Sequence, residues 1–186
     1  MTKILMLCVT ALLFSTLSFS QSFSMFLTID GVAGGSKSAR YQNAIDIYSY
    51  STGLSTCPES TGGGNKLCKP VITDLNVMLA MDKAIIPLKM GVVEGKVFTS
   101  ADMVLEVGGP TPFVFFRMHM EGVIISSLQE SGSGGGDSRP TVSSSLTFSR
   151  IAWQHIEQNA DGSAGAKTSG GWDLKANKPF SYFPIN

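Results

Sequence analysis

The stretch PFVFFRMHMEGVIISSLQ, residues 112–129, decides the fold of this chain. It is long, and it is rich in the β-branched and aromatic residues that favour strands. In its first half, polar and apolar side chains alternate: Arg117, His119 and Glu121 fall on one face, and Phe116, Met118 and Met120 fall on the other. This period of two predicts an extended strand with one buried face and one exposed face.

Segments with the same strand character precede this stretch. We expect strands within residues 26–30, 43–53, 71–81 and 101–109. Polar and apolar side chains alternate in the first three of them, and glycine is abundant in the turns between segments. They therefore extend the same antiparallel pattern towards the beginning of the chain.

A connector rich in Gly, Ser and Pro, residues 130–140, follows the long strand and leads to a further strand within residues 141–157. This strand changes phase along its length: Leu146 and Phe148 share one phase, and Ile151, Trp153 and His155 share the other. We therefore expect a bulge near Ser149 or Arg150. Residues 159–163, NADGS, then predict a hairpin that returns the chain.

One segment has helical rather than strand character. In PLKMGVVEGKVF, residues 87–98, Pro87 suits the first turn of a helix and Gly95 suits its end. The total is about seven or eight strands and one short helix. An open sheet of this size would expose a long edge, so the pattern predicts a closed or sandwiched antiparallel sheet, which is a mainly β fold.

The first twenty residues have the layout of a secretory signal peptide. Lys3 precedes the uncharged run ILMLCVTALLFSTLSF, and Ser18 and Ser20 supply small residues before a cut near Gln21. Cys8 lies inside the apolar run, too early for a lipoprotein signal. We expect residues 1–20 to be removed, leaving one domain over residues 21–186; an uncleaved anchor or a buried strand is the alternative.

The two cysteines of the mature chain, Cys57 and Cys68, bracket the glycine-rich loop CPESTGGGNKLC. An even number of cysteines in an exported chain favours a disulfide. A Cys57–Cys68 bridge would add about 3 kcal/mol by restricting the unfolded chain. A metal site is the competing interpretation, but two cysteines without a nearby histidine do not supply the four ligands of structural zinc. We expect no metal.

Charge and motifs argue against several classes of protein. Without Lys3 the chain has 13 basic and 14 acidic residues, and this balance gives no hint of a nucleic-acid partner. Signatures of serine hydrolases, zinc proteases and P-loop proteins are absent from the sequence. Both histidines, His119 and His155, lie in predicted strands; we expect His119 on the exposed face and His155 to pack beside Trp153. No catalytic residue and no cofactor is predicted.

Three parts of the chain resemble the haemolysin-coregulated protein (Hcp) family, the tube proteins of bacterial type VI secretion systems. The resemblance runs from about Met25 to Lys178. Its most specific motifs are Ile29-Asp30 with Gly34 to Lys37, Ile45-Asp46-Ile47 followed by aromatics alternating with serine, Ala160-Asp161-Gly162-Ser163, Gly171-Trp172-Asp173 and Ala176-Asn177-Lys178.

The resemblance implies a closed antiparallel β-barrel with one short flanking α-helix that assembles into hexameric rings. In the family, rings stack into a tube that moves through a contractile sheath and carries small effectors in its lumen, without catalysis. The implied partners are further copies of the chain, sheath or spike proteins and effectors, but neither nucleic acid nor a membrane. The glycine-rich loop is implied to connect stacked rings, with Thr56, Gly62, Gly63, Gly64 and Lys66 at the contact.

The amino-terminal segment departs from the family, whose members ordinarily carry no signal peptide. One interpretation takes Met25 as the true start of a tube subunit that is made in the cytoplasm and then secreted. The other takes the chain as an exported relative, a ring or carrier in the periplasm or the medium that works without the contractile apparatus. We favour export as the localisation and the tube-protein family as the description of function; a secreted enzyme is the third alternative.

Overall fold

The computed structural model describes residues 23–56, 58–61, 64–67, 69–109, 111–134 and 140–183. The predicted signal peptide, residues 1–20, lies outside the described residues. So do both cysteines of the predicted disulfide, Cys57 and Cys68.

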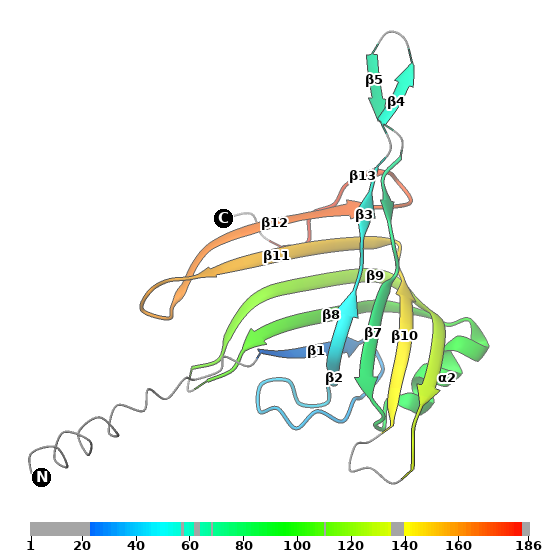
Figure 1. Cartoon of the computed structure of the whole chain (residues 1–186), viewed down its shortest axis with the longest axis vertical. Helices are drawn as coiled ribbons and strands as arrows, with labels where there is room; N and C mark the ends of the chain where they lie inside the picture. Colours follow the sequence, from blue (N-terminus) through cyan, green and yellow to red (C-terminus); the bar gives the residue numbers. More distant parts are fainter. Residues whose placement is uncertain are drawn as a thin grey trace, which may run out of the picture.

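Six antiparallel strands close into a barrel in the order β10-β7-β2-β1-β8-β9, and β9 pairs with β10 to complete it (Figure 1). The barrel strands are β1 (Phe23–Ile29), β2 (Ile45–Ser51), β7 (Leu75–Ala80), β8 (Val97–Val107), β9 (Phe113–Ser131) and β10 (Thr141–Thr147). The predicted closed antiparallel barrel is therefore confirmed. Because the barrel closes, each of these six strands pairs with a neighbour on both sides over at least part of its length.

Three further strands extend the sheet beyond β9: β11 (Arg150–Gln158), β12 (Ala164–Asp173) and β13 (Lys178–Pro179). The main sheet thus has nine strands, slightly more than the sequence predicted. Two small ladders lie apart from it, one between β3 (Leu54–Ser55) and β6 (Val71–Ile72) and one between β4 (Pro58–Thr61) and β5 (Gly64–Leu67).

Helix α2 (Ile85–Glu94) packs against the barrel through Ile85, Leu88 and Gly91. It begins at Ile85, so Pro87 lies in its first turn as predicted, and the last two residues of the stretch 87–98, Val97 and Phe98, already belong to β8. Its end was predicted correctly: Gly95 has a left-handed φ of 61°, its N–H donates to Val92 O, and the Lys96 N–H donates to Gly91 O. Within the described residues, no helix has the length and apolar character needed to span a membrane.

Apolar side chains from all six barrel strands fill the interior. The largest that are almost completely buried include Leu27, Ile45, Leu79, Met103, Met118, Met120 and Leu146. Met118 and Met120 point inward from β9, as the alternation in the sequence predicted. Removing one such side chain to alanine costs about 2–5 kcal/mol in typical cores, so this interior sets the stability of the fold.

The barrel and the extended sheet meet at Gly122 of β9. Gly122 has a φ of 59°, and a Cβ at this position would lie 2.8 Å from the Ser149 hydroxyl. The predicted bulge near Ser149 is a complete break, because Phe148 and Ser149 separate two strands. As a result β10 pairs with β9 beyond Gly122, and β11 pairs with β9 before it.

Candidate functional site

Strands β3 to β6 form an arm that projects from the barrel, here called the arm and described over residues 54–56, 58–61, 64–67 and 69–72 (Figure 1). Within the described residues, its outer strands, β4 and β5, contact each other and make at most weak contacts with any other helix or strand. Two side chains near its base, Leu54 and Val71, are 64% and 56% exposed. The arm therefore presents backbone and apolar surface that the barrel does not cover.

Hydrogen bonds fix the base of the arm to the barrel. The Gly53 N–H donates to Thr73 Oγ1 at 2.8 Å, the Thr73 N–H donates to Gly53 O at 2.9 Å, and the Thr52 hydroxyl donates to Thr73 O at 3.2 Å. These bonds join the end of β2 to the beginning of β7. The direction in which the arm leaves the barrel is thus set at its base.

Three of the five predicted contact residues lie in the described part of the arm. Thr56 is exposed, and Gly64 and Lys66 lie in β5, opposite Thr61 and Glu59 in the register. Gly62 and Gly63 lie outside the described residues. The loop is therefore a β-hairpin in its described part, which the glycine-rich sequence alone did not indicate.

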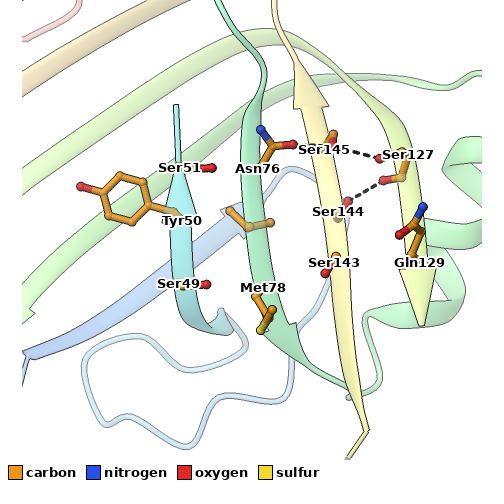
Figure 2. Close-up of a pocket in the computed structure, with 11 residues that line it drawn as sticks. Ser49, Tyr50, Ser51, Asn76, Met78, Ser127, Gln129, Ser143, Ser144 and Ser145 are labelled. Atoms are coloured by element: carbon orange, nitrogen blue, oxygen red, sulfur yellow. Dashed lines mark hydrogen bonds between the residues drawn. The ribbon is translucent and has the colours of Figure 1, made fainter. Parts of the chain in front are cut away.

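A second surface lies on the outer side of four neighbouring barrel strands, β2, β7, β10 and β9 (Figure 2). We call it the serine face; its residues are Ser49, Ser51, Asn76, Met78, Ser127, Gln129, Ser143 and Ser145. A shallow hollow of about 430 Å³ runs along it, and none of the residues that line the hollow is charged. The face is polar, neutral and open to solvent.

Hydrogen bonds between neighbouring strands order the hydroxyls of this face. The Ser127 hydroxyl donates to Ser145 Oγ at 2.9 Å, and the Ser145 hydroxyl donates to Asn76 Oδ1 at 2.6 Å (Figure 2). These bonds pair the polar groups of Ser127, Ser145 and Asn76 with one another, so these groups do not require a specific ligand. The signal was present in the sequence as serine runs in IDIYSYS and TVSSSLT, but the sequence analysis did not assign them a shared surface.

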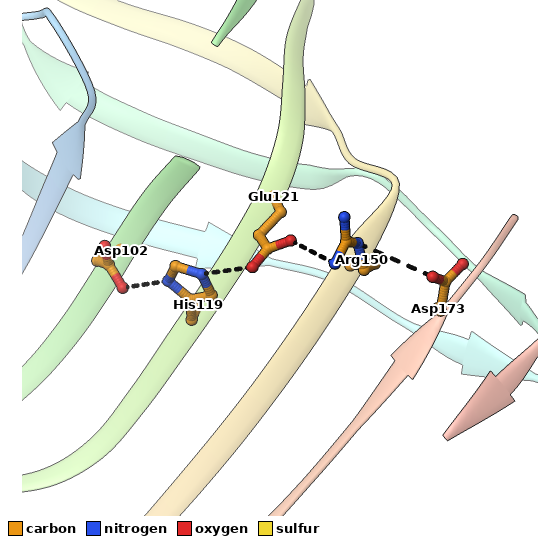
Figure 3. Close-up of polar contacts among 5 residues, drawn as sticks. All are labelled: Asp102, His119, Glu121, Arg150 and Asp173. Carbon is orange, nitrogen blue, oxygen red and sulfur yellow. Dashed lines mark hydrogen bonds and ion pairs between the residues drawn. The ribbon is translucent and has the colours of Figure 1, made fainter. Parts of the chain in front are cut away.

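A third surface crosses the outer side of β8, β9, β11 and β12 (Figure 3). We call it the charged row; its residues are Asp102, His119, Glu121, Arg150 and Asp173. His119 Nδ1 donates to Asp102 Oδ1 at 2.7 Å, and Nε2 lies 3.5 Å from Glu121 Oε1. Arg150 then bridges two carboxylates, with Nη1 2.9 Å from Glu121 and Nε 3.8 Å from Asp173.

The two histidines occupy environments opposite to those predicted. His119 is only 3% exposed, because the aromatic ring of Tyr182 stacks on it. His155, which was expected to pack beside Trp153, is exposed. The alternation correctly predicted that both histidines lie in strands, β9 and β11. It could not predict the burial of His119, because Tyr182 of the carboxy-terminal segment, which is distant in the sequence, covers this side chain.

The charged row lacks the parts of a catalytic site. His119 is held between two carboxylates, and in the described residues no serine, threonine or cysteine side chain contacts it as a nucleophile would. No group of three or more potential metal ligands is assembled within the described ranges either. The row is best explained as cross-strand ion pairing that stabilises the extended sheet.

Comparison with known proteins gives consistent matches. The family model described as "Type VI secretion system effector, Hcp" matches residues 26–155. Protein hcp1 of Pseudomonas aeruginosa is 30% identical over 156 residues, which cover 82% of this chain and 96% of that protein. The family-model match spans the barrel strands from Phe26 onward and the whole of the arm.

Solved structures share the fold. A type six secretion system protein superposes with a TM-score of 0.79 at 26% identity, covering 86% of this chain and all of the other. Hcp1 of Salmonella typhimurium gives a TM-score of 0.70 at 23% identity, with 86% of this chain and 99% of the other covered. A type VI secretion system effector from Yersinia pestis gives 0.65 at 21% identity, with 80% and 98% covered.

Proposed function

Because this chain belongs to the Hcp family of type VI secretion tube proteins, we propose that it is a structural subunit whose copies close into a hexameric ring and stack ring upon ring. The observation that supports stacking is the arm, which projects from the barrel (Figure 1) and exposes Leu54 and Val71. The serine face supports a role for the stacked rings as a conduit.

The arm needs a partner that its own barrel does not provide. An isolated two-stranded hairpin is at best marginally stable in water, and in the described part of the chain β4 and β5 make at most weak contacts with any element but each other. Ordering such a segment costs about 1–2 kcal/mol of conformational entropy per residue. Docking of the arm on the next ring would offset that loss, since it would bury Leu54 and Val71 and supply partners for exposed backbone groups.

A Cys57–Cys68 disulfide would prepare the arm for docking. The register of the arm pairs Pro58 with Leu67 and Glu59 with Lys66. In the sequence, Cys57 directly precedes β4 and Cys68 directly follows β5, so a bridge between them would close the hairpin that these strands form. Such a bridge at the root of the hairpin would lower the ordering entropy that is lost on docking.

The serine face suits the wall of a lumen. Its residues are uncharged and mostly serines, and Ser127, Ser145 and Asn76 are already bonded to one another, so the face imposes little desolvation cost on a passing polypeptide. Effectors of different charge could then lie in the lumen without strong binding. The hollow along this face would give each subunit one shallow contact site for cargo.

We further propose that residues 1–20 direct export and that the mature ring lies in the periplasm or the medium. The β1–β8 ladder supports a mature chain that begins before Met25, because Phe23 and Ser24 already pair with Val107 and Glu106. An oxidising compartment would also allow the disulfide of the arm. In this proposal the protein acts by shape and assembly, without catalysis, cofactor or nucleic acid.

The intact mass of the protein from its native cell, taken without reduction and with free thiols blocked, tests export and disulfide together. We expect a chain that begins near Gln21 and lacks the two thiol hydrogens. A chain that begins at Met25 with both thiols blocked would instead identify a cytoplasmic tube subunit without the bridge.

Replacing residues 57–68 with a short glycine–serine link tests the arm. We expect rings to persist and stacks to disappear, as seen by negative-stain electron microscopy. The matched control replaces another glycine-rich segment of the sequence, residues 132–139, with the same link, and should leave stacking intact. Equal loss of stacking in both variants would remove the special role of the arm, and absence of rings in the unmodified protein would remove the proposal as a whole.

A further inference from the structure

The carboxy-terminal segment folds back over the sheet that carries the charged row. After β12 the chain turns, with Asn177 in a left-handed conformation (φ 51°), and β13 pairs with Trp172 and Asp173. The Phe180 N–H then donates to Gly171 O at 3.0 Å. Beyond this bond, residues 181–183 are attached through side chains, since no backbone hydrogen bond of theirs is seen in the described part of the chain.

Two aromatic side chains of this segment, Phe180 and Tyr182, pack against side chains of the sheet. The Phe180 ring lies 5.4 Å from the Arg150 guanidinium carbon. The Tyr182 ring stacks on the His119 imidazole, with 3.4 Å between centroids and 6° between planes. His119 is buried by this contact, whereas Tyr182 itself remains 49% exposed. The segment therefore covers the sheet but is not embedded in it.

The surface beneath the segment is shaped for a peptide backbone. A Cβ at position 171 would lie 2.5 Å from Ile151 O of the sheet and 2.7 Å from Phe180 O of the segment, so both backbones approach closely and glycine is required there. Hollows of about 250 and 500 Å³ flank the segment, the first beside Ser169 and Gly170 and the second beside Arg117. The groove is thus wider than its present occupant.

We propose that the outer face of β8, β9, β11 and β12 is a docking groove for a short aromatic peptide, and that residues 178–183 of the same chain are its resident, detachable occupant. The groove selects an extended peptide with aromatic side chains at two alternate positions. It provides a backbone acceptor at Gly171, a guanidinium at Arg150 and a stacking surface at His119. When the segment leaves, these groups are open to another peptide with the same spacing.

Modification of the two histidines by diethyl pyrocarbonate, followed by peptide mass analysis, tests whether the segment covers the groove. In the full chain, exposed His155 is the internal reference and His119 should react slowly. We expect Tyr182→Ala to raise the rate at His119 relative to His155 by roughly tenfold or more, because the reaction then no longer waits for local opening. Ser181→Ala, which changes an exposed neighbour, is the matched control and should leave the ratio unchanged.

Circular dichroism establishes that both variants are folded. Equal protection of His119 in the Tyr182→Ala variant and in the unchanged chain would overturn the proposal. Equal deprotection by Ser181→Ala and Tyr182→Ala would also overturn it, since the effect would then not depend on the aromatic ring. Protection that appears only at high protein concentration would mean that the segment docks on a second copy, which contradicts an occupant from the same chain.

Replacement of the occupant tests the groove itself. A synthetic peptide with the sequence of residues 178–183, KPFSYF, is added to the full chain carrying Phe180→Ala and Tyr182→Ala. We expect it to restore slow modification of His119, and a peptide with alanine in place of its tyrosine should not. Failure of the KPFSYF peptide at saturating concentration, or equal protection by both peptides, would show that no docking groove exists.

Discussion

The two halves of β9 carry opposite kinds of surface, although they form one continuous strand. Before Gly122, the strand contributes His119 and Glu121 to the charged row (Figure 3). After Gly122, it contributes Ser127 and Gln129 to the serine face, where no charge lines the hollow (Figure 2). The first half pairs with β11 of the extended sheet, and the second pairs with β10 of the barrel.

This difference separates a surface that is covered by the chain's own carboxy-terminal segment from one that is open to solvent. In the charged row, Arg150 lies between two carboxylates and His119 lies under Tyr182, so the groups find their partners within the chain. The serine face has no charge that must be paired or desolvated when another molecule approaches. In the proposed ring, only the second surface is suited to contact with many different polypeptides.

Gly122→Val should give the largest effect, because it disrupts the junction between the two halves. A β-branched residue would adopt a left-handed conformation there and would meet the Ser149 hydroxyl at 2.8 Å. We expect a loss of about 2–4 kcal/mol in the free energy of unfolding, measured by urea titration. Gly170→Ala is the control, since a Cβ at that position meets open space. Similar losses in both variants would mean that the junction is not special.

Arg150→Ala should have an intermediate effect, because it leaves Glu121 and Asp173 without the cation between them. Their side chains are 26% and 19% exposed, whereas Arg150 itself is 45% exposed. Solvent screening reduces the expected loss to about 1–2 kcal/mol, and high salt should shrink it further. The more exposed pair Lys89–Glu130 supplies the control. If Lys89→Ala destabilises the fold as much, the charged row is ordinary surface pairing.

Ser143→Asp should have the smallest effect on stability, about 0.5 kcal/mol, because Ser143 is exposed on β10. Its effect on function should be larger, since a ring would place a negative charge on every subunit of the lumen wall. We expect less small effector protein to be recovered with purified rings. Thr168→Asp, on exposed β12 of the other region, should not change recovery. Equal recovery with both variants would argue that the serine face is not the cargo surface.

Local patterns predicted the barrel well. Alternation identified the inward-facing Met118 and Met120, and the glycine at position 95 ended the helix as expected. Residues 159–163 form the predicted turn, with Gly162 at a φ of 84° and its N–H donating to Asn159 O. These features depend on residues that are close together in the sequence, so local sequence patterns are sufficient to predict them.

Features set by contacts between distant residues were predicted less well. The single strand expected within 141–157 is broken at Phe148 and Ser149, because β10 and β11 pair with different halves of β9. The burial of His119 depends on Tyr182, which is more than sixty positions away in the sequence. The serine face depends on bringing four strands together, and alternation within one strand cannot show which strands become neighbours.

The most direct test of the ring proposal is the mass of the assembled protein in solution. Sedimentation velocity of residues 21–186, purified without reducing agent and examined over a wide range of concentrations, measures this mass. We expect a discrete species with the mass of a hexameric ring, together with larger stacks as the concentration rises. A monomer at every concentration would contradict the proposal that this chain is a ring-forming tube subunit.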